Sequence, residues 1–486
     1  MKICYNVRVN ADGLKRERKG IMAKQRGCFI KKNLIYILLV LIISCVAFTA
    51  CLDFNNQKPS EGLEFQLSSD GTYYILIGRG TCEDTRIVVP AKYEGKPVEV
   101  IAYESHIELF GDEILEEIVI PEGVKKISPK AFHLCYSLKT VHIPKSLEEI
   151  GNRAFAYAPI ENIYLKDLKS WLNASGYIYC SDRTNYYING RLLTDLRIPN
   201  GIVEIKERAF YGCMNIETVS MPSSVKNIGD NAFAHCGYLK SVQFSDTLET
   251  IGQGAFYVCG DIEELVLPDS LKTIEPYAFG DNTSLTRLAL GSGIETIGEN
   301  AFSSCFALFE IFDKSNLKLE MGTESHGKIA YNAKLITDNS SETRLKNISD
   351  YIFYIDGDEA YLLTYRGNSK NLVLPNISMN YKVNDGAFSE GHWDCPNVGI
   401  ESVYIPQFVT EIGDYAFLCC WNLKQVTVSS GVSKIGDYAF FRCNSLSSIN
   451  YNGTVKQWNA IYKEKNWCPS VHSATIICTD GTITLD

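Results

Sequence analysis

Hydrophobic residues alternate with polar ones in short stretches that recur along the chain. Four of them read LKTVHIP (138–144), IETVSMP (216–222), IEELVLP (262–268) and ESVYIP (401–406). The alternating core, such as V-x-I or L-x-L, points neighbouring side chains to opposite faces, as in a β-strand. The Pro that follows cannot donate a ladder hydrogen bond. Each stretch therefore predicts one short strand that ends at the Pro.

A second apolar stretch follows a few residues after each predicted strand. It reads VKNIG (225–229), LETIG (248–252), LKTIE (271–275) or IETIG (294–298), and Ala-Phe comes next, usually with Cys three positions after the Phe. Gly229, Gly252 and Gly298 suit positions that require a positive φ or the close approach of another segment. We therefore expect the chain to turn two corners in each unit.

The Ala-Phe pair marks a fixed repeat. It ends at Phe132, Phe155, Phe210, Phe233, Phe256, Phe279, Phe302, Phe388, Phe417 and Phe440. From Phe210 to Phe302 the step is 23 residues four times in succession. A constant period of this size predicts a solenoid. One turn cannot bury its own Leu, Ile and Ala-Phe residues, whereas about ten stacked coils with strands about 4.8 Å apart share one core.

The combined pattern is Leu/Ile-x-x-Val-x-Ile-Pro-x-x-Val/Leu-x-x-Ile-Gly-x-x-Ala-Phe-x-x-Cys. It resembles the BspA-type leucine-rich repeat of bacterial surface proteins over about residues 90–450. The commoner leucine-rich repeat has an Asn ladder after the strand, where this chain has Pro or a small residue. We expect a leucine-rich-repeat solenoid of mainly short parallel β-strands joined by turns or short helical segments, with β-hairpin insertions and a C-terminal cap.

Two insertions interrupt the repeats. They contain residues 170–199 and 341–375. The second insertion has the same order of strand, Asp-Gly turn and strand as residues 62–90. We interpret each insertion as a hairpin that begins a block of coils. The tail breaks the pattern and predicts a cap. We expect a signal peptide with a basic leader (1–50), a lipid-anchor linker (51–61), an N-terminal hairpin with degenerate first repeats (62–120), a first repeat block with an insertion near 166–195 (121–312), an inter-block insertion with a hairpin (313–375), a second block (376–450) and the cap (451–486).

The N-terminal segment predicts export. Residues 1–50 contain ten Lys or Arg residues against Asp12 and Glu17, and residues 33–52 carry no charge. The apolar segment ends in Phe-Thr-Ala-Cys, which resembles a bacterial lipobox and predicts acylation of Cys51. Cys45 is a second candidate, Met22 is an alternative start, and an uncleaved signal anchor is an alternative, since the segment can span a bilayer. Every version places the repeats outside the cytoplasm, tethered to the membrane at the cell surface.

The charge balance bears on the partner. The whole chain has a net charge of −10, and without the basic leader this becomes about −18. Phosphate binding needs a positive field. We therefore expect no nucleic-acid partner.

Cysteine follows the repeat. Residues three positions after the repeat Phe include Cys135, Cys213, Cys236, Cys259, Cys305, Cys420 and Cys443. Free Cys packs as a small hydrophobe, so this spacing predicts a buried row of thiols. Exported proteins commonly form disulfides, and stacked neighbours such as Cys213 and Cys236 would lie within disulfide reach. Oxidation is therefore the alternative.

The sequence contains no strong catalytic or metal-binding motif. His392 and Cys395 supply only two ligands on one loop. Residues 355–359 lack the length and Gly placement of a calcium loop and are expected to form a hairpin turn. Glu148 and Glu149 fall on outward positions, and no G-x-S-x-G, phosphate-loop or H-E-x-x-H motif occurs. We expect no enzyme activity, metal or cofactor.

The middle outward residue of each predicted strand defines a candidate ligand-binding row. Its members are His142, Tyr164, Arg197, Ser220, Gln243, Val266, Ala289, Tyr404, Thr427 and Asn450. The row is nearly uncharged in an acidic chain, which favours protein contact. The alternative is an ordinary sheet surface with residues of high β-propensity.

The resemblance to BspA-like proteins implies adhesion to host matrix glycoproteins or to other cells. The row and the resemblance together predict a protein or glycoprotein ligand, whereas a glycan-binding module or an envelope scaffold is the alternative. Clustered aromatic residues would favour a glycan. Tyr164 and Tyr404 are the only Tyr, Trp or Phe residues in the predicted row. This small number favours a protein ligand.

Overall fold

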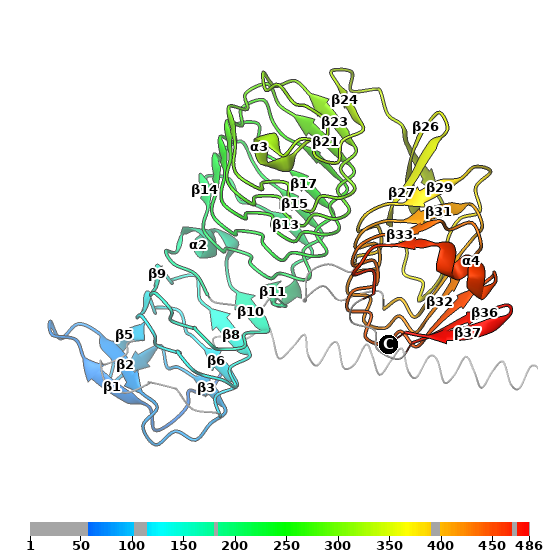
Figure 1. Ribbon diagram of the computed structural model, residues 1–486. Helices are drawn as coiled ribbons and strands as arrows, with labels where there is room; N and C mark the ends of the chain where they lie inside the picture. Colours follow the sequence, from blue (N-terminus) through cyan, green and yellow to red (C-terminus); the bar gives the residue numbers. More distant parts are fainter. Residues whose placement is uncertain (1–56, 102–113, 179–182, 390–398, 469–473, 486) are drawn as a thin grey trace, which may run out of the picture. The chain divides into compact units, whose positions relative to one another are not determined.

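The computed structural model describes residues 57–101, 114–178, 183–389, 399–468 and 474–485. The chain divides into two compact units, Met1–Lys58 and Pro59–Asp486. All the described strands lie in the second unit (Figure 1). This unit contains its own hydrophobic cores. The predicted export segment, Cys51, His392 and Cys395 lie outside the described residues.

Each coil begins with a strand of three or more residues that pairs in parallel with its counterpart in the next coil. We call the outer surface of these sheets the strand face. In the first block its strands are β3 (Arg86–Val88), β6 (Glu117–Val119), β8 (Thr140–Ile143), β10 (Asn162–Leu165), β11 (Asn185–Ile188), β13 (Asp195–Arg197), β15 (Thr218–Ser220), β17 (Ser241–Gln243), β19 (Glu264–Val266), β21 (Arg287–Leu290), β23 (Glu310–Asp313) and β24 (Leu335–Thr337). In the second block they are β28 (Asn371–Val373), β30 (Ser402–Ile405), β32 (Gln425–Val428), β34 (Ser448–Tyr451) and β36 (Thr475–Cys478).

A second strand, usually shorter, follows in most coils and forms separate parallel sheets. These strands are β5 (Lys96–Ile101), β7 (Lys126–Ile127), β9 (Glu149–Ile150), β14 (Glu204–Ile205), β16 (Asn227–Ile228), β18 (Thr250–Ile251), β20 (Thr273–Ile274), β22 (Thr296–Ile297), β29 (Tyr381–Val383), β31 (Val409–Ile412), β33 (Lys434–Ile435) and β35 (Tyr462–Lys463). The parallel solenoid and its two corners per coil are as the sequence predicts.

The predicted number of coils is wrong, because the solenoid has about 16 turns instead of about ten. Strands such as β11, β24 and β36 keep the alternating pattern, but no Ala-Phe pair completes their coils. Counting Ala-Phe pairs therefore misses coils at the insertions and at the end of a block.

Antiparallel hairpins interrupt or end the sheets. They are β1 (Glu64–Leu67) with β2 (Tyr74–Gly78), β4 (Lys92–Tyr93) with β5, β11 with β12 (Arg191–Leu192), β26 (Tyr351–Asp356) with β25 (Leu345–Ile348) and β27 (Glu359–Tyr365), and β36 with β37 (Gly481–Thr484). Gly357 has a φ of 58° in the turn between β26 and β27. Three short helical segments, α2 (Leu168–Asn173), α3 (Ser325–Lys328) and α4 (Val455–Ala460), complete the described elements.

The repeated Phe residues form stacks inside each block. Ring centroids of Phe210, Phe233, Phe256, Phe279 and Phe302 follow one another at 5.5, 5.2, 5.4 and 5.3 Å. The insertion interrupts this stack, and there the Tyr186 ring lies 5.6 Å from that of Phe210. The two blocks have separate main cores.

The cysteines after each Phe are buried, and the described ones are free thiols. Each of several thiols donates a hydrogen bond to the carbonyl of the Phe in the preceding coil. The sulfur-to-oxygen distance is 3.3 Å from Cys236 to Phe210 and 3.1 Å from Cys259 to Phe233. The row of thiols thus links successive coils through polar contacts as well as through packing.

The repeated glycines are required by close approach, not by a positive φ. A Cβ on Gly229 would lie 2.7 Å from the backbone nitrogen of Glu207 in the preceding coil. The positive φ angles of the coils fall mainly on other residues, such as Arg208 (52°) and Asn231 (53°).

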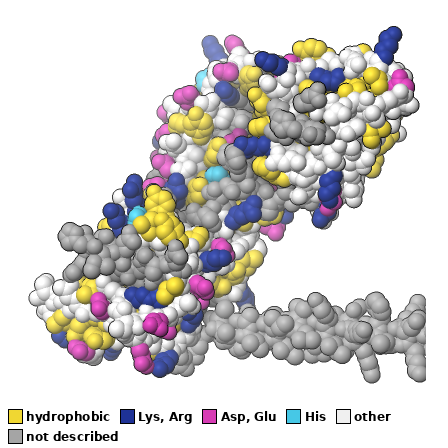
Figure 2. Space-filling view, turned by 60° about the horizontal axis from the view of Figure 1, so that its bottom comes forward, with side chains coloured by type: hydrophobic (Ala, Val, Ile, Leu, Met, Phe, Trp, Pro, Cys, Tyr) yellow, Lys and Arg dark blue, Asp and Glu magenta, His cyan; other side chains and the backbone are white. Residues whose placement is uncertain are grey.

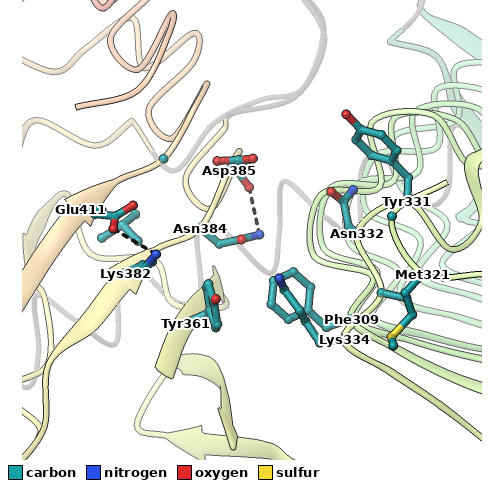
Figure 3. Close-up of a pocket in the computed structure, with 14 residues that line it drawn as sticks. Phe309, Met321, Tyr331, Asn332, Lys334, Tyr361, Lys382, Asn384, Asp385 and Glu411 are labelled. Atoms are coloured by element: carbon teal, nitrogen blue, oxygen red, sulfur yellow. Dashed lines mark hydrogen bonds and ion pairs between the residues drawn. The ribbon is translucent and has the colours of Figure 1, made fainter. Parts of the chain in front are cut away.

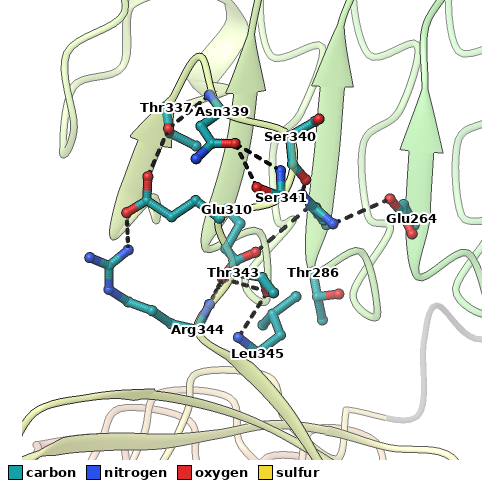
Figure 4. A network of polar contacts seen from close by, with 12 residues as sticks. Glu264, Thr286, Glu310, Thr337, Asn339, Ser340, Ser341, Thr343, Arg344 and Leu345 are labelled. Atoms are coloured by element: carbon teal, nitrogen blue, oxygen red, sulfur yellow. Dashed lines mark hydrogen bonds and ion pairs between the residues drawn. The ribbon is translucent and has the colours of Figure 1, made fainter.

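A buried carboxylate ties the inter-block segment to the first block (Figure 4). Glu310 of β23 is 2% exposed, and its Oε1 accepts hydrogen bonds from the backbone nitrogen of Arg344 (2.5 Å) and from Oγ1 of Thr343 (3.1 Å). Arg344 also pairs with Asp356 at 2.9 Å. This network joins β23 to the hairpin that begins the second block.

Candidate binding surface

Parallel register aligns the predicted ligand-binding row within four separate sheets. The aligned residues are His142 with Tyr164, Arg197 with Ser220 and Gln243, Val266 with Ala289, and Tyr404 with Thr427 and Asn450. The row also contains residues that the sequence reasoning missed, namely Val88, Val119, Tyr187, Phe312, Thr337, Val373 and Ile477. The alternating pattern, as in NYYI at 185–188, would have found them without the Ala-Phe requirement.

The members of the row differ in exposure. Val266 (61%) and Tyr404 (41%) are exposed, as are Arg197 and Gln243. Tyr164, Ser220, Ala289, Thr427 and Asn450 are half-buried. His142 is only 7% exposed, because the stacked ring of Tyr164 and the Glu117 side chain contact it.

Three rings form a stacked group across β8, β10 and β11, which we call the aromatic column. The centroids of His142 and Tyr164 are 4.5 Å apart with an interplanar angle of 10°. Those of Tyr164 and Tyr187 are 4.4 Å apart at 11°. Because the strands pair in register, the rings repeat at the strand spacing and each covers the face of the next.

Polar side chains border the aromatic column. The Glu117 carboxylate lies 2.7 Å from Nε2 of His142 and 3.0 Å from Nε of Arg86. Burial raises the pKa of Glu117, but the hydrogen bond with His142 and the charge of Arg86 outweigh this effect. The pKa of Glu117 therefore lies below its usual value. Nearby, Nδ2 of Asn185 donates to Oδ1 of Asn162 at 3.3 Å.

The stacking limits what the aromatic column can contact. Its inner ring faces are already covered, and the row continues to Val119 at one end and to Leu192 at the other. The column therefore offers ring edges and phenol hydroxyls instead of open ring faces. Sugar rings prefer open aromatic faces, whereas protein interfaces use Tyr edges and hydroxyls together with Arg.

Ion pairs connect successive coils beside the sheets. Examples are Lys126 with Glu149 (2.9 Å), Lys226 with Glu249 (3.1 Å) and Lys240 with Glu217 (3.0 Å). On the face drawn in Figure 2, basic and acidic side chains are interspersed. Exposed pairs of this kind contribute about 0–1 kcal/mol each, so they do little to stabilise the fold.

A pocket of about 570 Å³ is lined by residues of both blocks, among them Phe309, Lys334, Tyr361, Lys382 and Asp385 (Figure 3). Lys382 pairs with Glu411 at 2.9 Å, and Nδ2 of Asn384 donates to the Phe306 carbonyl at 2.9 Å. Asp385 accepts from the Asp414 backbone nitrogen at 2.8 Å, and burial raises the pKa of its carboxyl. These polar groups serve the local fold, and the lining places no nucleophile beside a general base.

The acidic segment 355–359 forms a hairpin turn, and Asp356 pairs with Arg344. Within the described ranges, no group of three or more His, Cys, Asp or Glu side chains is arranged to hold a metal ion. In the same ranges no helix is long and apolar enough to cross a membrane.

Comparison with solved structures finds leucine-rich repeat proteins of bacteria. A leucine-rich repeat protein from Bacteroides ovatus is 19% identical, with 87% of this chain and 90% of that chain covered and a TM-score of 0.33. A leucine rich cell surface protein from Faecalibacterium prausnitzii is 22% identical, with 84% and 98% covered and a TM-score of 0.27. The pneumococcal vaccine antigen PcpA is 19% identical, with 87% and 93% covered and a TM-score of 0.34.

No curated protein matches the chain. The family model of the BspA type Leucine rich repeat region matches in six copies, over residues 106–194, 184–309, 249–356 and 360–466. Since these matches cover most of the sequence and the coils have the expected register, the chain belongs to the BspA-type leucine-rich-repeat family.

Proposed function

We propose that this chain is a binding protein of the bacterial cell surface, lipid-anchored through Cys51, and that its aromatic column is the centre of contact with a protein ligand. The single observation that carries the ligand site is the stack of His142, Tyr164 and Tyr187 on the strand face. The surface location rests on the export signal and lipobox of the sequence and on the family resemblance.

The aromatic column has the chemistry of a protein-contact centre. Tyr and Arg are enriched at such centres, and here two Tyr rings continue the stack from His142, whose partner Glu117 also pairs with Arg86. Leu192, 47% exposed, extends the apolar part of the surface beyond Tyr187. Because the rings are already stacked, little side-chain freedom is lost when a ligand binds.

Adhesion is the role that this surface would serve. A rigid stack of coils presents the same face over many strands, which suits a large protein ligand. The resemblance to BspA-like proteins implies a matrix glycoprotein or another cell as the partner. We propose a host matrix glycoprotein.

The experiment is saturable binding of purified residues 59–486, the compact unit, to a panel of immobilised matrix glycoproteins. The double variant Tyr164→Ala/Tyr187→Ala should weaken binding by about tenfold or more, as removal of a buried aromatic contact does. The variant Tyr136→Ala is the matched control, because Tyr136 is 58% exposed and lies in the turn before β8, outside the strands of the strand face. It should bind like the wild type.

Full binding by the double variant would move the site away from the aromatic column. Failure to bind any host component, combined with binding to the bacterium's own envelope fraction, would replace adhesion with an envelope-scaffold role.

A further inference from the structure

The strand face of the second block has no charged side chain on its outward positions. These positions are Asn371 and Val373 on β28, Ser402 and Tyr404 on β30, Gln425 and Thr427 on β32, Ser448 and Asn450 on β34, and Thr475 and Ile477 on β36. The hairpin strand β37 adds Thr482 and Thr484 in the same rows. We call this surface the uncharged face.

The first block differs at the equivalent positions. There the outward residues include Arg86, Glu117, Asp195, Arg197, Glu264 and Arg287. A charge-free run of five strands and a hairpin in a chain with a net charge of −10 is therefore specific to the second block. The uncharged face has no cation that would attract a carboxylate, sulfate or phosphate group.

Most polar groups of the uncharged face are available to a ligand. Oγ of Ser402 donates to Oδ1 of Asn371 at 2.7 Å. In the described part of the chain, Gln425, Ser448 and Asn450 make no side-chain hydrogen bond. Their amides and hydroxyl both donate and accept, and they recur at the strand spacing of about 4.8 Å.

Tyr404 gives the uncharged face an aromatic surface that is not stacked on another ring. It is 41% exposed and lies in register between Val373 and Thr427. Among the described residues, no other ring contacts it. Its ring is thus covered by no other aromatic ring, unlike those inside the aromatic column, and the residue remains partly open to a ligand.

The charged side chains that border the uncharged face are engaged by neighbouring groups: Glu401 pairs with two lysines, and Asp480, in the turn between β36 and β37, accepts from the Val455 backbone nitrogen at 2.7 Å. Glu401 lies 2.8 Å from Nζ of Lys424 and 3.6 Å from Nζ of Lys370. Protein interface centres are depleted in Ser and enriched in aromatics and Arg, and this face has the opposite composition. Its chemistry suits a neutral, hydroxyl-rich ligand.

We infer that the uncharged face binds a neutral glycan chain, with the Tyr404 ring against a sugar ring and with Gln425, Ser448 and Asn450 as hydrogen-bonding groups. A polymer of repeated sugar units suits a surface that repeats the same kinds of group from strand to strand. This surface and ligand class are separate from the aromatic column and its protein ligand.

The test is affinity electrophoresis of residues 59–486 through gels that contain a neutral polysaccharide (β-glucan, mannan or galactomannan) or an acidic one (hyaluronan or heparin). At least one neutral polysaccharide should retard the wild type, and neither acidic one should. Because the contact is uncharged, the retardation should be the same at high salt. Tyr404→Ala should weaken binding by about tenfold, and Asn450→Ala should weaken it by less. Tyr404→Phe, which keeps the ring, should retain most of the binding.

Two control variants show whether glycan binding is confined to the uncharged face. Tyr136→Ala should be retarded like the wild type, and so should Tyr164→Ala/Tyr187→Ala, which tests the proposed protein site independently. The inference is overturned if no neutral polysaccharide retards the protein, if the acidic ones retard it as strongly, or if Tyr404→Ala has no effect. The inference is also overturned if the protein binds no glycan and Tyr404→Ala abolishes binding of a protein ligand. That result would assign the uncharged face to protein contact.

Discussion

At the scale of single residues, the position three after the repeat Phe makes the same contact in several coils. Cys305 donates to the Phe279 carbonyl at 3.2 Å, and Cys443 donates to that of Phe417 at 3.2 Å. In one coil Asn282 replaces Cys, and its Nδ2 donates to the Phe256 carbonyl at 3.0 Å. The position therefore favours a buried donor, although the buried Ala158 occupies it in the coil of Phe155.

This contact predicts the cost of removing one thiol. Cys236→Ala deletes the donor to the buried Phe210 carbonyl, whereas Cys82→Ala deletes a buried thiol outside the repeat position. The Phe210 carbonyl keeps its hydrogen bond from the Cys213 backbone nitrogen (3.2 Å), so Cys236→Ala removes one of two hydrogen bonds. One buried hydrogen bond contributes about 0.5–1.5 kcal/mol, and Cys236→Ala should lower the free energy of unfolding by about that much more than Cys82→Ala. Chemical unfolding of both variants measures the difference. Equal losses would mean that the thiols act by packing alone.

Periodicity alone predicted that these cysteines are buried. It could not predict their carbonyl partners, because those depend on how the turn of one coil lies on the turn of the next. Tyr187 was missed for a related reason: its coil has the strand but not the Ala-Phe pair that marked the repeats.

At the scale of elements, α2 shows how an insertion is held on the solenoid. Asp167 caps the helix by accepting from the Ser170 backbone nitrogen at 2.7 Å, and Nε1 of the buried Trp171 donates to the Ala209 carbonyl at 3.0 Å. Nζ of Lys206 lies 3.9 Å from the Trp171 ring and donates to the Ala174 carbonyl at 2.9 Å. The sequence predicted only a hairpin in this insertion, since six helical residues give too little periodicity to recognise.

Lys206 gives this packing a pH dependence. Burial lowers its pKa from 10.5 to about 7. Between these pH values the unfolded chain holds a proton that the folded chain has lost, so stability should rise with pH across this range. Unfolding free energies of the wild type and Lys206→Met, measured from pH 7 to pH 10, should show a rise of up to about 3 kcal/mol that is present only in the wild type. Parallel curves for the two proteins would show that Lys206 remains charged when folded.

At the scale of the whole molecule, Glu310 is the contact that most directly secures the segment between the blocks. Glu310→Ala should cost about 3 kcal/mol locally, because it leaves the Arg344 nitrogen and Thr343 hydroxyl without their buried acceptor. Limited proteolysis should then cleave residues 339–344 faster. Glu264→Ala is the control, since the Glu264 side chain is 55% exposed and lies 3.9 Å from Arg287. Unchanged cleavage of Glu310→Ala would show that other contacts hold the segment.

The sequence predicted the solenoid and the hairpins well because their signals are repeated many times. It could not predict the contacts between blocks, such as those that Glu310 makes with residues more than 30 positions later, because each of these contacts occurs only once. The aromatic column and the uncharged face also emerge only when the register of the strands is known.

The proposed lipid anchor at Cys51 can be tested by metabolic labelling. Cells are grown with labelled palmitate and express either the wild type, Cys45→Ala or Cys51→Ala. The wild type and Cys45→Ala should incorporate the label. Cys51→Ala should carry no label and should no longer be found in the membrane fraction as a lipid-modified protein. Labelling of Cys51→Ala with loss of label in Cys45→Ala would shift the modified residue to Cys45.

The most direct measurement of the central claim is adhesion of intact cells that display equal amounts of wild type, Tyr164→Ala/Tyr187→Ala or Tyr136→Ala to immobilised matrix glycoprotein. We predict that the wild type and Tyr136→Ala promote adhesion equally and that the double variant lowers it about tenfold. Full adhesion by the double variant at equal display would contradict a binding site at the aromatic column.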